Sequence, residues 1–284
     1  MKTFRYIKLN GAGNDFVLID EKINQNLLIT PSDVTRICDR NNGIGADGLI
    51  IIKDDKVSDF EMIYYNADGS TGSLCGNGAR CAIKYAQISN RIEGNTVQFS
   101  SNKIEYSGEI INDKVIKFYL QPVSEIKINF KLKAFGQLIN SYYVDTGSPH
   151  VIININDILI NSKNPKAVFE DIQLVPVDKI GREIRNLPEF RPNGTNVNFI
   201  DINETHIKIR SFERGVEGET LACGTGSVAA AIIAKLVYKK NAPIKLITKS
   251  NAELIVNFEM GNNEIVNVSL TGPVEIEKEG QYSI

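Results

Sequence analysis

The stretch CGNGAR at residues 75–80 is echoed by CGTGSV at residues 223–228, and each copy leads directly into a long helical pattern. One copy falls in each half of the 284-residue chain. A cysteine at the start of a helix ionises readily, because the unpaired N–H groups and the helix dipole stabilise a thiolate. Two such cysteines, one in each half, predict a pseudo-symmetric site with one sulfur on each side of a substrate.

The composition is that of an ordinary globular protein, with 42% hydrophobic residues, 23% charged residues and a formal net charge of −2. Because lysine and arginine are not clustered, we expect neither a nucleic-acid partner nor an anionic membrane surface. The longest purely apolar run, residues 228–234, is far shorter than the ~20 residues that span a bilayer. Charges interrupt the apolar residues at the N-terminus, so we expect no signal peptide and a cytoplasmic protein with reduced cysteines.

Most of the chain is predicted to be β-strand, in short segments rich in Ile, Val, Phe and Tyr that are bounded by turn residues. The strands expected in the first half cover residues 4–9, 16–20, 49–52, 60–65, 97–100 and 115–120. Those expected in the second half cover residues 138–144, 151–153, 196–201, 206–211, 244–248, 254–258 and 265–270.

Two long helices are expected over residues 77–89 and 225–239, with a weaker one over residues 31–39. Residues 228–234 are apolar nearly all round, which is typical of a buried helix. Each half is therefore predicted to wrap many strands around one central helix that begins at the CGxG turn. The linker between the halves is expected near residues 121–123.

Motif spacing excludes several other kinds of site. No CxxC motif occurs, which argues against thioredoxin-like and zinc-ribbon sites, and His150 and His206 lack the paired spacing of a metal site. The glycine turns lack the lysine of a P-loop. The sequence GIGADG at residues 43–48 precedes a strand, whereas a dinucleotide-binding turn follows one.

The remaining cysteines and histidines carry weaker signals. Cys38 and Cys81 fall within helical patterns and are expected to be small buried core residues. His206 is expected to be an exposed or half-buried strand residue. His150 stands at a turn before a strand, and a histidine near a thiol can accept its proton or stabilise the thiolate.

Motifs along nearly the whole chain together resemble those of the diaminopimelate epimerases, which are cofactor-independent amino-acid epimerases. In the first half these are GAGNDF (11–16), DRNNGIGADG (39–48), NADGS (66–70) and CGNGARC (75–81). In the second half they are GSPH (147–150), NVNF (196–199), ERG (213–215) and ETLACGTG (219–226). Proline racemases share the two-cysteine plan but not these full blocks.

The resemblance implies an α+β fold with two pseudo-symmetric domains, each a β-barrel-like sheet around a central helix, and an active site in the cleft between them. The N-terminal epimerase domain would comprise residues 1–120 with the returning segment 270–284, and the C-terminal domain residues 121–269. The resemblance also implies a homodimer that acts on an amino-acid substrate in lysine and peptidoglycan precursor synthesis, without a cofactor or metal.

Residue roles follow from the family's motifs at the matching positions. Cys75 and Cys223 are expected to be the two acid/base residues, and His150 and Glu213 to tune their pKa values. The reacting α-carboxylate is expected at the backbone of Gly76, Asn77, Gly224 and Thr225. The other polar groups of the substrate are expected to meet Asn14, Asn66, Asn196, Glu213 and Arg214.

A few positions depart from the family's usual pattern. Asn10 stands in place of a histidine, Gly48 in place of a glutamine, and Ser148 in place of an asparagine. One residue is added within residues 215–219. Because both cysteines are kept, the predicted chemistry remains epimerisation, and these changes bear on the substrate contacts.

Two alternatives remain open at the level of the sequence. Ser148 keeps open a racemase or epimerase of another amino acid on the same scaffold. A different class of protein would be a redox-switched binding protein, in which Cys75 and Cys223 form a reversible disulfide and no turnover occurs.

Overall fold

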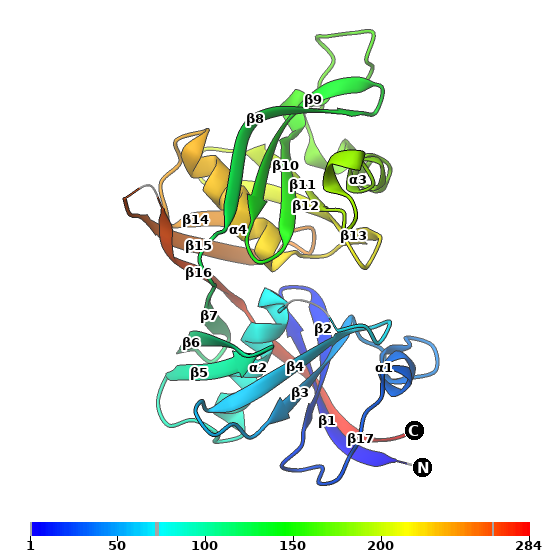
Figure 1. The fold of residues 1–284 in the computed structure, drawn as a ribbon, viewed down its shortest axis with the longest axis vertical. Coiled ribbons are helices and arrows are strands. Elements are labelled where there is room, and N and C mark those ends of the chain that lie inside the picture. Colours follow the sequence, from blue (N-terminus) through cyan, green and yellow to red (C-terminus); the bar gives the residue numbers. More distant parts are fainter. Residues whose placement is uncertain (1, 72–73, 263) are drawn as a thin grey trace. The chain divides into compact units, whose positions relative to one another are not determined.

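The computed structural model describes residues 2–71, 74–262 and 264–284. The chain divides into two compact units (Figure 1): Met1–Leu120 with Thr271–Ile284 form unit 1, and Gln121–Leu270 form unit 2. Among the described residues, no helix is both long and apolar enough to cross a membrane.

Unit 1 is a sheet whose neighbouring strands run in the order β17, β1, β2, β3, β4, β5, β6 and β7. The β2–β3 and β4–β5 pairs are parallel and the other pairs are antiparallel. The strands are β1 (Thr3–Gly11), β2 (Asn14–Asp20), β3 (Gly48–Lys53), β4 (Phe60–Asn66), β5 (Thr96–Ser101), β6 (Ile104–Asn112), β7 (Val115–Tyr119) and β17 (Glu275–Ser283).

Unit 2 repeats this pairing pattern. From β9 through β10, β11, β12 and β14 to β15, the pairs alternate between antiparallel and parallel, as they do from β1 to β6 in unit 1. β8 pairs with β9 and β13 with β12. The strands are β8 (Glu125–Ala134), β9 (Gln137–Asp145), β10 (Pro149–Asn154), β11 (Asn196–Ile202), β12 (Ile207–Glu213), β13 (Gly218–Thr220), β14 (Ile244–Ile247) and β15 (Glu253–Met260). They are followed by β16 (Ile265–Pro273), whose residues from Thr271 on belong to unit 1.

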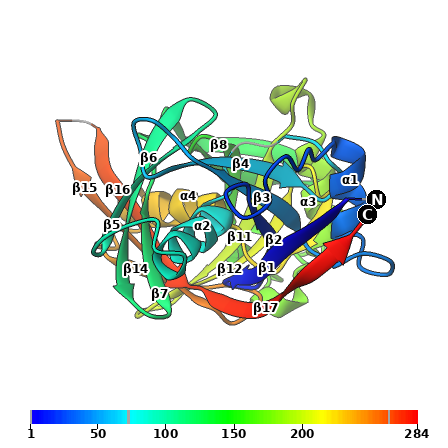
Figure 2. The same cartoon turned by 90° about the horizontal axis from the view of Figure 1, so that it is seen from below.

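Each unit is built around one buried helix. In unit 1, α2 (Gly76–Ile88) packs against strands from both ends of the sheet order, including β1 and β7, so the sheet curls around it (Figures 1 and 2). In unit 2, α4 (Gly224–Leu236) packs in the same way against strands from β9 to β15. Burial of Ala and Ile over almost the whole surface of α4 supplies the hydrophobic driving force for this arrangement.

The other helices lie on the outer side of the sheets. α1 (Pro31–Cys38) packs on β3 and buries Val34 and Ile37, and its N-terminus is fixed by a capping box between Thr30 and Asp33. α3 (Val177–Arg185) packs on β11 and β12. The remaining elements among the described residues are three short 3₁₀ turns, η1 (Ile155–Asp157), η2 (Ile172–Leu174) and η3 (Pro188–Phe190).

Every strand expected from the sequence has a counterpart, and Cys38 and Cys81 are buried as predicted. Four strands, β6, β8, β13 and β17, and the helix α3 were not expected. The prediction that the second long helix reaches residue 239 is wrong, because α4 ends at Leu236. Lys239 has a φ of 59°, and the N–H of Lys240 donates to the carbonyl of Ala234, which closes the helix with a left-handed turn.

Candidate active site

In unit 1, predicted site residues lie at one edge of the sheet, at the ends of three neighbouring strands. Asn14 begins β2, Gly48 begins β3 and Asn66 ends β4. The register places Gly48 opposite Asn66, and Phe16 opposite Gly48. Because β2 and β3 are parallel and β4 runs back, these three ends share one edge.

Unit 2 places its residues at the equivalent strand ends. His150 lies at the start of β10, Asn196 begins β11 and Glu213 ends β12. The register pairs His150 with Asn196 across the parallel strands. The pseudo-symmetry read from the two CGxG motifs therefore extends to the strand ends that accompany them.

The two cysteines stand at the N-termini of the buried helices. Cys75 is the N-cap residue of α2 and Cys223 that of α4, and neither helix has an acidic residue in its first turn. The first N–H groups of a helix have no intrahelical acceptor, so the N-terminus attracts an anion. Within the described residues, neither cysteine side chain accepts a capping hydrogen bond from its own helix. Each unit thus presents a thiol beside a set of backbone donors.

In unit 1, a chain of side-chain hydrogen bonds fixes the amide of Asn14. Its Nδ2 donates to Oδ2 of Asp47 at 3.0 Å, and its Oδ1 accepts from Nδ2 of Asn77 at 2.6 Å. Asn77 is the second residue of α2 and is only 1% exposed. Asn14 is therefore held against the helix that carries Cys75. Asn66 belongs to a separate turn, in which its Nδ2 donates to Oγ of Ser70 at 3.0 Å.

Next to these hydrogen bonds, a cluster of charged side chains surrounds the buried carboxylate of Asp15. Arg40 donates to both oxygens of Asp15 at 2.9 and 3.1 Å and also to Asp47 at 2.6 Å, and Lys8 pairs with Asp15 at 2.7 Å. Burial raises the pKa of Asp15, but the hydrogen bonds and charges of Arg40 and Lys8 outweigh it and lower the pKa to about 2. The cluster therefore fixes Asp47, which in turn fixes Asn14.

The Asp15→Asn variant is expected to lose about 1–2 kcal/mol of stability at pH 7, because the ion pairs to Arg40 and Lys8 disappear. The folded-state pKa of Asp15 lies below its ordinary value of 3.8, so its contribution is complete above about pH 4 and is lost as pH falls toward 2. The melting temperature, measured between pH 2 and 7, should fall less steeply toward low pH in the variant than in the wild type. The Asp54→Asn variant, at an exposed carboxylate, is the control. If the melting temperature of Asp15→Asn fell with pH as steeply as that of the wild type, the contribution assigned to the Asp15 ion pairs would be contradicted.

In unit 2, His150 is fully buried and held from both ring nitrogens. Its Nε2 lies 3.0 Å from Oγ1 of Thr225, and its Nδ1 lies 3.1 Å from Nδ2 of Asn198. Burial, aided by the charge of Arg214, lowers the pKa of His150 to about 3, so the ring is neutral at physiological pH. Thr225 Oγ1 also lies 3.8 Å from Sγ of Cys223. The neutral ring of His150 is therefore connected to the thiol of Cys223 through the hydroxyl of Thr225.

The amide of Asn196 ties the strand ends of unit 2 together. Its Nδ2 donates to Oγ of Ser148 and to the carbonyl of Pro149, both at 3.0 Å, and its Oδ1 accepts from the N–H of Arg214 at 2.8 Å. Ser148 thus has a defined role as an acceptor for Asn196. Glu213 accepts a short hydrogen bond from the hydroxyl of Thr220.

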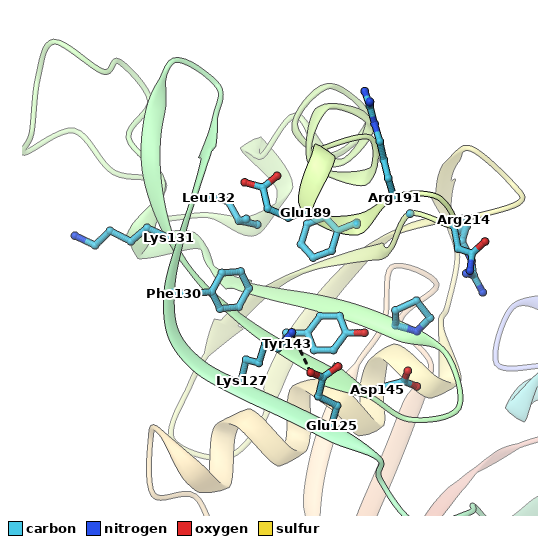
Figure 3. A pocket seen from close by; sticks show the side chains of 14 residues that line it. Glu125, Lys127, Phe130, Lys131, Leu132, Tyr143, Asp145, Glu189, Arg191 and Arg214 are labelled. Carbon is cyan, nitrogen blue, oxygen red and sulfur yellow. Dashed lines mark ion pairs between the residues drawn. The ribbon is translucent and has the colours of Figure 1, made fainter.

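A cavity of about 570 Å³ opens within unit 2, and Arg214 is the predicted site residue that lines it (Figure 3). The rings of Tyr143 and Phe190 stack at 6.3 Å along it, and the ammonium of Lys127 lies 5.2 Å from the Tyr143 ring centroid. Lys127 also pairs with Glu125 at 2.9 Å. Arg214 therefore lines a space whose walls combine aromatic rings with charged side chains.

The structure also explains two of the departures from the expected pattern. Asn10 donates to Glu277 at 2.8 Å and accepts from the N–H of Gly13 at 2.7 Å, so it shapes the turn before Asn14. At Gly48, a Cβ would come within 2.7 Å of the carbonyl of Tyr65 and 2.8 Å of the Tyr64 ring. A larger residue at this position would require the neighbouring strand to move.

Three polar residues at the two half-sites were missed in the sequence analysis: Asp47, Arg80 and Asn198. Asn198 carried a usable signal, because it follows Asn196 by two positions in a strand and therefore shares its face. Asp47 and Arg80 lie inside quoted motifs, but their partners come from distant segments that spacing alone does not identify.

The family model described as "Diaminopimelate epimerase" matches residues 6–124 and 142–276. The chain is 38% identical to a diaminopimelate epimerase of Aquifex aeolicus, over 97% of this chain and 96% of the relative. It is 36% identical to a diaminopimelate epimerase of Chlorobaculum tepidum, over 97% of this chain and all of the relative.

Solved structures with low sequence identity share the fold. A phenazine biosynthesis protein of the PhzF family from Bacillus anthracis matches with a TM-score of 0.72 and 16% identity, over 100% of both chains. A hydroxyproline epimerase from Agrobacterium vitis matches with a TM-score of 0.69 and 12% identity, over 99% of this chain and 92% of that chain. These likenesses confirm the α+β fold with two pseudo-symmetric parts.

Proposed function

Because the chain belongs to the diaminopimelate epimerase family, we propose that it is an isomerase that converts L,L-diaminopimelate to the meso isomer without a cofactor. The observation that carries this proposal is the pair of cysteines that cap two buried helices, each beside polar strand ends. The reaction serves lysine and peptidoglycan precursor synthesis.

Inversion of an α-carbon requires that its proton leave from one face and that a proton return on the other. A single base would tend to return the proton to the face from which it came. We propose that Cys75 and Cys223 serve the two faces as base and acid, and that their roles exchange with the direction of the reaction. One of the two must then be a thiolate and the other a thiol when substrate binds.

The α-proton of an amino acid is a very weak acid, so the negative charge that develops on the α-carboxylate must be stabilised. The N-termini of α2 and α4 can supply fixed backbone donors, from Gly76 and Asn77 and from Gly224 and Thr225. Loss of one such donor typically raises a barrier by ~3–4 kcal/mol. The proposed arrangement therefore replaces the electron sink that a cofactor would provide.

Diaminopimelate has a second amino-acid end, which must be recognised without reacting. We assign this role to Asn14, Asn66, Asn196, Glu213 and Arg214. Support comes from the bonds that hold several of these groups in place, such as the contact of Asn196 with the N–H of Arg214. A guanidinium can bind a carboxylate through two parallel hydrogen bonds, which suits Arg214. His150 and Glu213 are proposed to tune the thiols.

Further parts of the proposal concern the whole protein. We assign residues 1–120 with 270–284 to an N-terminal epimerase domain and residues 121–269 to a C-terminal one, which the compact units support. We also propose that the protein is a homodimer and is located in the cytoplasm. Acid/base chemistry by cysteine needs reduced thiols, and the cytoplasm keeps thiols reduced.

Proton NMR in D2O, under reductant, tests the function with L,L-diaminopimelate and a panel of other L-amino acids. The proposal predicts loss of the α-proton signal together with the appearance of the meso isomer. Exchange with another amino acid alone would keep the chemistry and overturn the substrate. Binding that depends on reductant, with no exchange of any α-proton, would favour a redox-switched binding protein instead.

A further inference from the structure

Arg80 is the largest fully buried side chain of the described structure, with 0% of its surface exposed. It lies on α2 and folds back toward the start of the helix, where its Nη1 donates to the carbonyl of Gly76 at 3.3 Å. Its Nη2 donates to Oδ1 of Asn77 at 3.0 Å. Among the described residues, its Nε has no hydrogen-bond partner and no carboxylate lies within ion-pair distance.

This position is electrostatically unfavourable for a cation. The positive end of the helix dipole lies at the same turn, and a buried charge is costly unless an opposite charge compensates it. Burial lowers the pKa of Arg80 to about 10, so the guanidinium remains charged at physiological pH. The fold therefore holds an uncompensated positive charge at the two residues that follow Cys75.

Cys81, the next residue of the helix, and Cys75, its N-cap, are the two groups whose negative charge, if they ionised, would raise the pKa of Arg80. Cys81 is fully buried, and burial raises the pKa of its thiol well above the usual range, so it stays protonated. Glu277, which also acts on Cys81, is engaged by Lys8 at 3.4 Å and by Asn10. Cys75 is half-buried and caps the helix, so it is the group that can supply the missing negative charge.

Unit 2 lacks this feature. The residue five positions after Cys223 is Val228, which is fully buried and uncharged, whereas Arg80 holds the matching position after Cys75. His150 beside Thr225 is neutral, because burial and Arg214 lower its pKa to about 3. Arg214 itself is half-buried and borders the cavity of unit 2. The echoed motifs thus differ by one buried charge.

We propose that Arg80 is a positioning residue that holds Cys75 as the thiolate in the substrate-free protein, while Cys223 rests as the thiol. The consequence of this charge state for catalysis rests on the proposed epimerase function. It follows that the substrate-free protein is ready to deprotonate the isomer whose α-proton faces Cys75.

The test measures ionisation directly in the full-length, substrate-free protein. After reduction, iodoacetamide is applied between pH 5 and 10, and peptide mass spectrometry follows the alkylation of Cys75 and Cys223 separately. The pH midpoint of each rate profile is compared, because the midpoint does not depend on how accessible each thiol is. We expect the midpoint of Cys75 to lie below that of Cys223 by about one pH unit or more. Coincident midpoints would overturn the proposal.

Variants identify Arg80 as the cause. Arg80→Met should raise the midpoint of Cys75 by about one unit or more, and Arg80→Lys, which keeps the charge, should restore most of the shift. Lys84→Met is the matched control, since Lys84 is a mostly buried cation one turn further along α2 that bonds Gln87. If Arg80→Met does not fold, Arg80→Gln, which also removes the charge but keeps hydrogen-bonding groups, takes its place in the comparison with Arg80→Lys.

Two outcomes separate this inference from the proposed function. A higher KM in Arg80→Met, with the midpoint of Cys75 unchanged, would show that the guanidinium serves the substrate carboxylate, and the proposal would be wrong. The predicted midpoints in a protein that exchanges no α-proton of any amino acid would support the role of Arg80 and refute the epimerase function.

Discussion

Replacement of Cys223 by alanine is expected to lower kcat for epimerisation about 10³-fold or more, and Cys75→Ala should have an effect of the same order. Each variant removes the group that we propose to serve one face of the α-carbon, so a proton can no longer be taken from one face and supplied to the other. Conversion of L,L-diaminopimelate to the meso isomer, followed by chiral separation of the products, measures the loss.

Cys38→Ala provides the control for these variants. Cys38 is 4% exposed and packs with Val34 and Ile37 in a core cluster of unit 1 that is separate from the one holding α2 and Cys75. Its replacement should cost about 1 kcal/mol of stability through a small cavity and leave kcat nearly unchanged. Retention of wild-type kcat by Cys75→Ala or Cys223→Ala would refute the two-base proposal.

The Gly226→Ala variant is expected to lose at least about 100-fold in activity and 1–3 kcal/mol in stability through overpacking. A Cβ at this position would collide with the side-chain oxygen of Asn198 and approach Sγ of Cys223 to 3.1 Å. Asn198 cannot move away, because it is fully buried and bonded to His150 and Ser211. The added methyl group therefore displaces either the thiol of Cys223 or the side chain of Asn198 with the His150 ring bonded to it.

The pseudo-symmetry of the chain supplies the matched control. Gly78 holds the same place after Cys75, but the nearest atoms to a Cβ there belong to Ile50, Met62 and Cys75, at 3.4–3.6 Å. Those are ordinary contacts, and alanine favours the helix more than glycine does. Gly78→Ala should therefore keep its activity within a few-fold and gain slightly in thermal stability. Equal losses of activity in Gly226→Ala and Gly78→Ala would contradict the proposal that close packing of Gly226 against Asn198 and Cys223 causes the loss.

The sequence predicts the centre of each unit well, because the signals there are local. The run of Ala and Ile in residues 228–234 can only be satisfied by burial on all sides, and α4 is buried in this way. Cysteine and glycine at the start of each helical pattern mark the N-termini, and Cys75 and Cys223 are the N-cap residues. These features need no knowledge of distant parts of the chain.

The missed elements depend on distant partners. β17 carries charged and exposed residues along most of its length, and it is held as a strand by pairing with β1 at the other end of the chain. In α3, Gly181 weakens the helical signal, yet a Cβ there would come within 2.5 Å of Phe212. β8 did show alternating apolar residues, but much of it is exposed, and that alternation should have predicted a strand.

For the site, the sequence identifies the types of residue, but it does not show which of them form hydrogen bonds with one another or which are buried. Asn14 and Asn77 are 63 positions apart, and only the folded unit shows that they share a hydrogen bond. The charge of Arg80 is visible in the motif, whereas its complete burial is not. Ser148 raised a question about substrate contacts, and its bond to Asn196 shows that it orders the strand ends of unit 2.

The most direct test of the two-base proposal is the isotope content of the first product formed in D2O. L,L-diaminopimelate is mixed with excess reduced protein, the reaction is stopped within one turnover, and the separated isomers are analysed by mass spectrometry. The account predicts that the meso product carries deuterium at the inverted α-carbon while unreacted L,L-diaminopimelate keeps its protium. A meso product that retains protium at the inverted carbon would mean that one group moves the same proton between faces, and the two-cysteine account would be wrong.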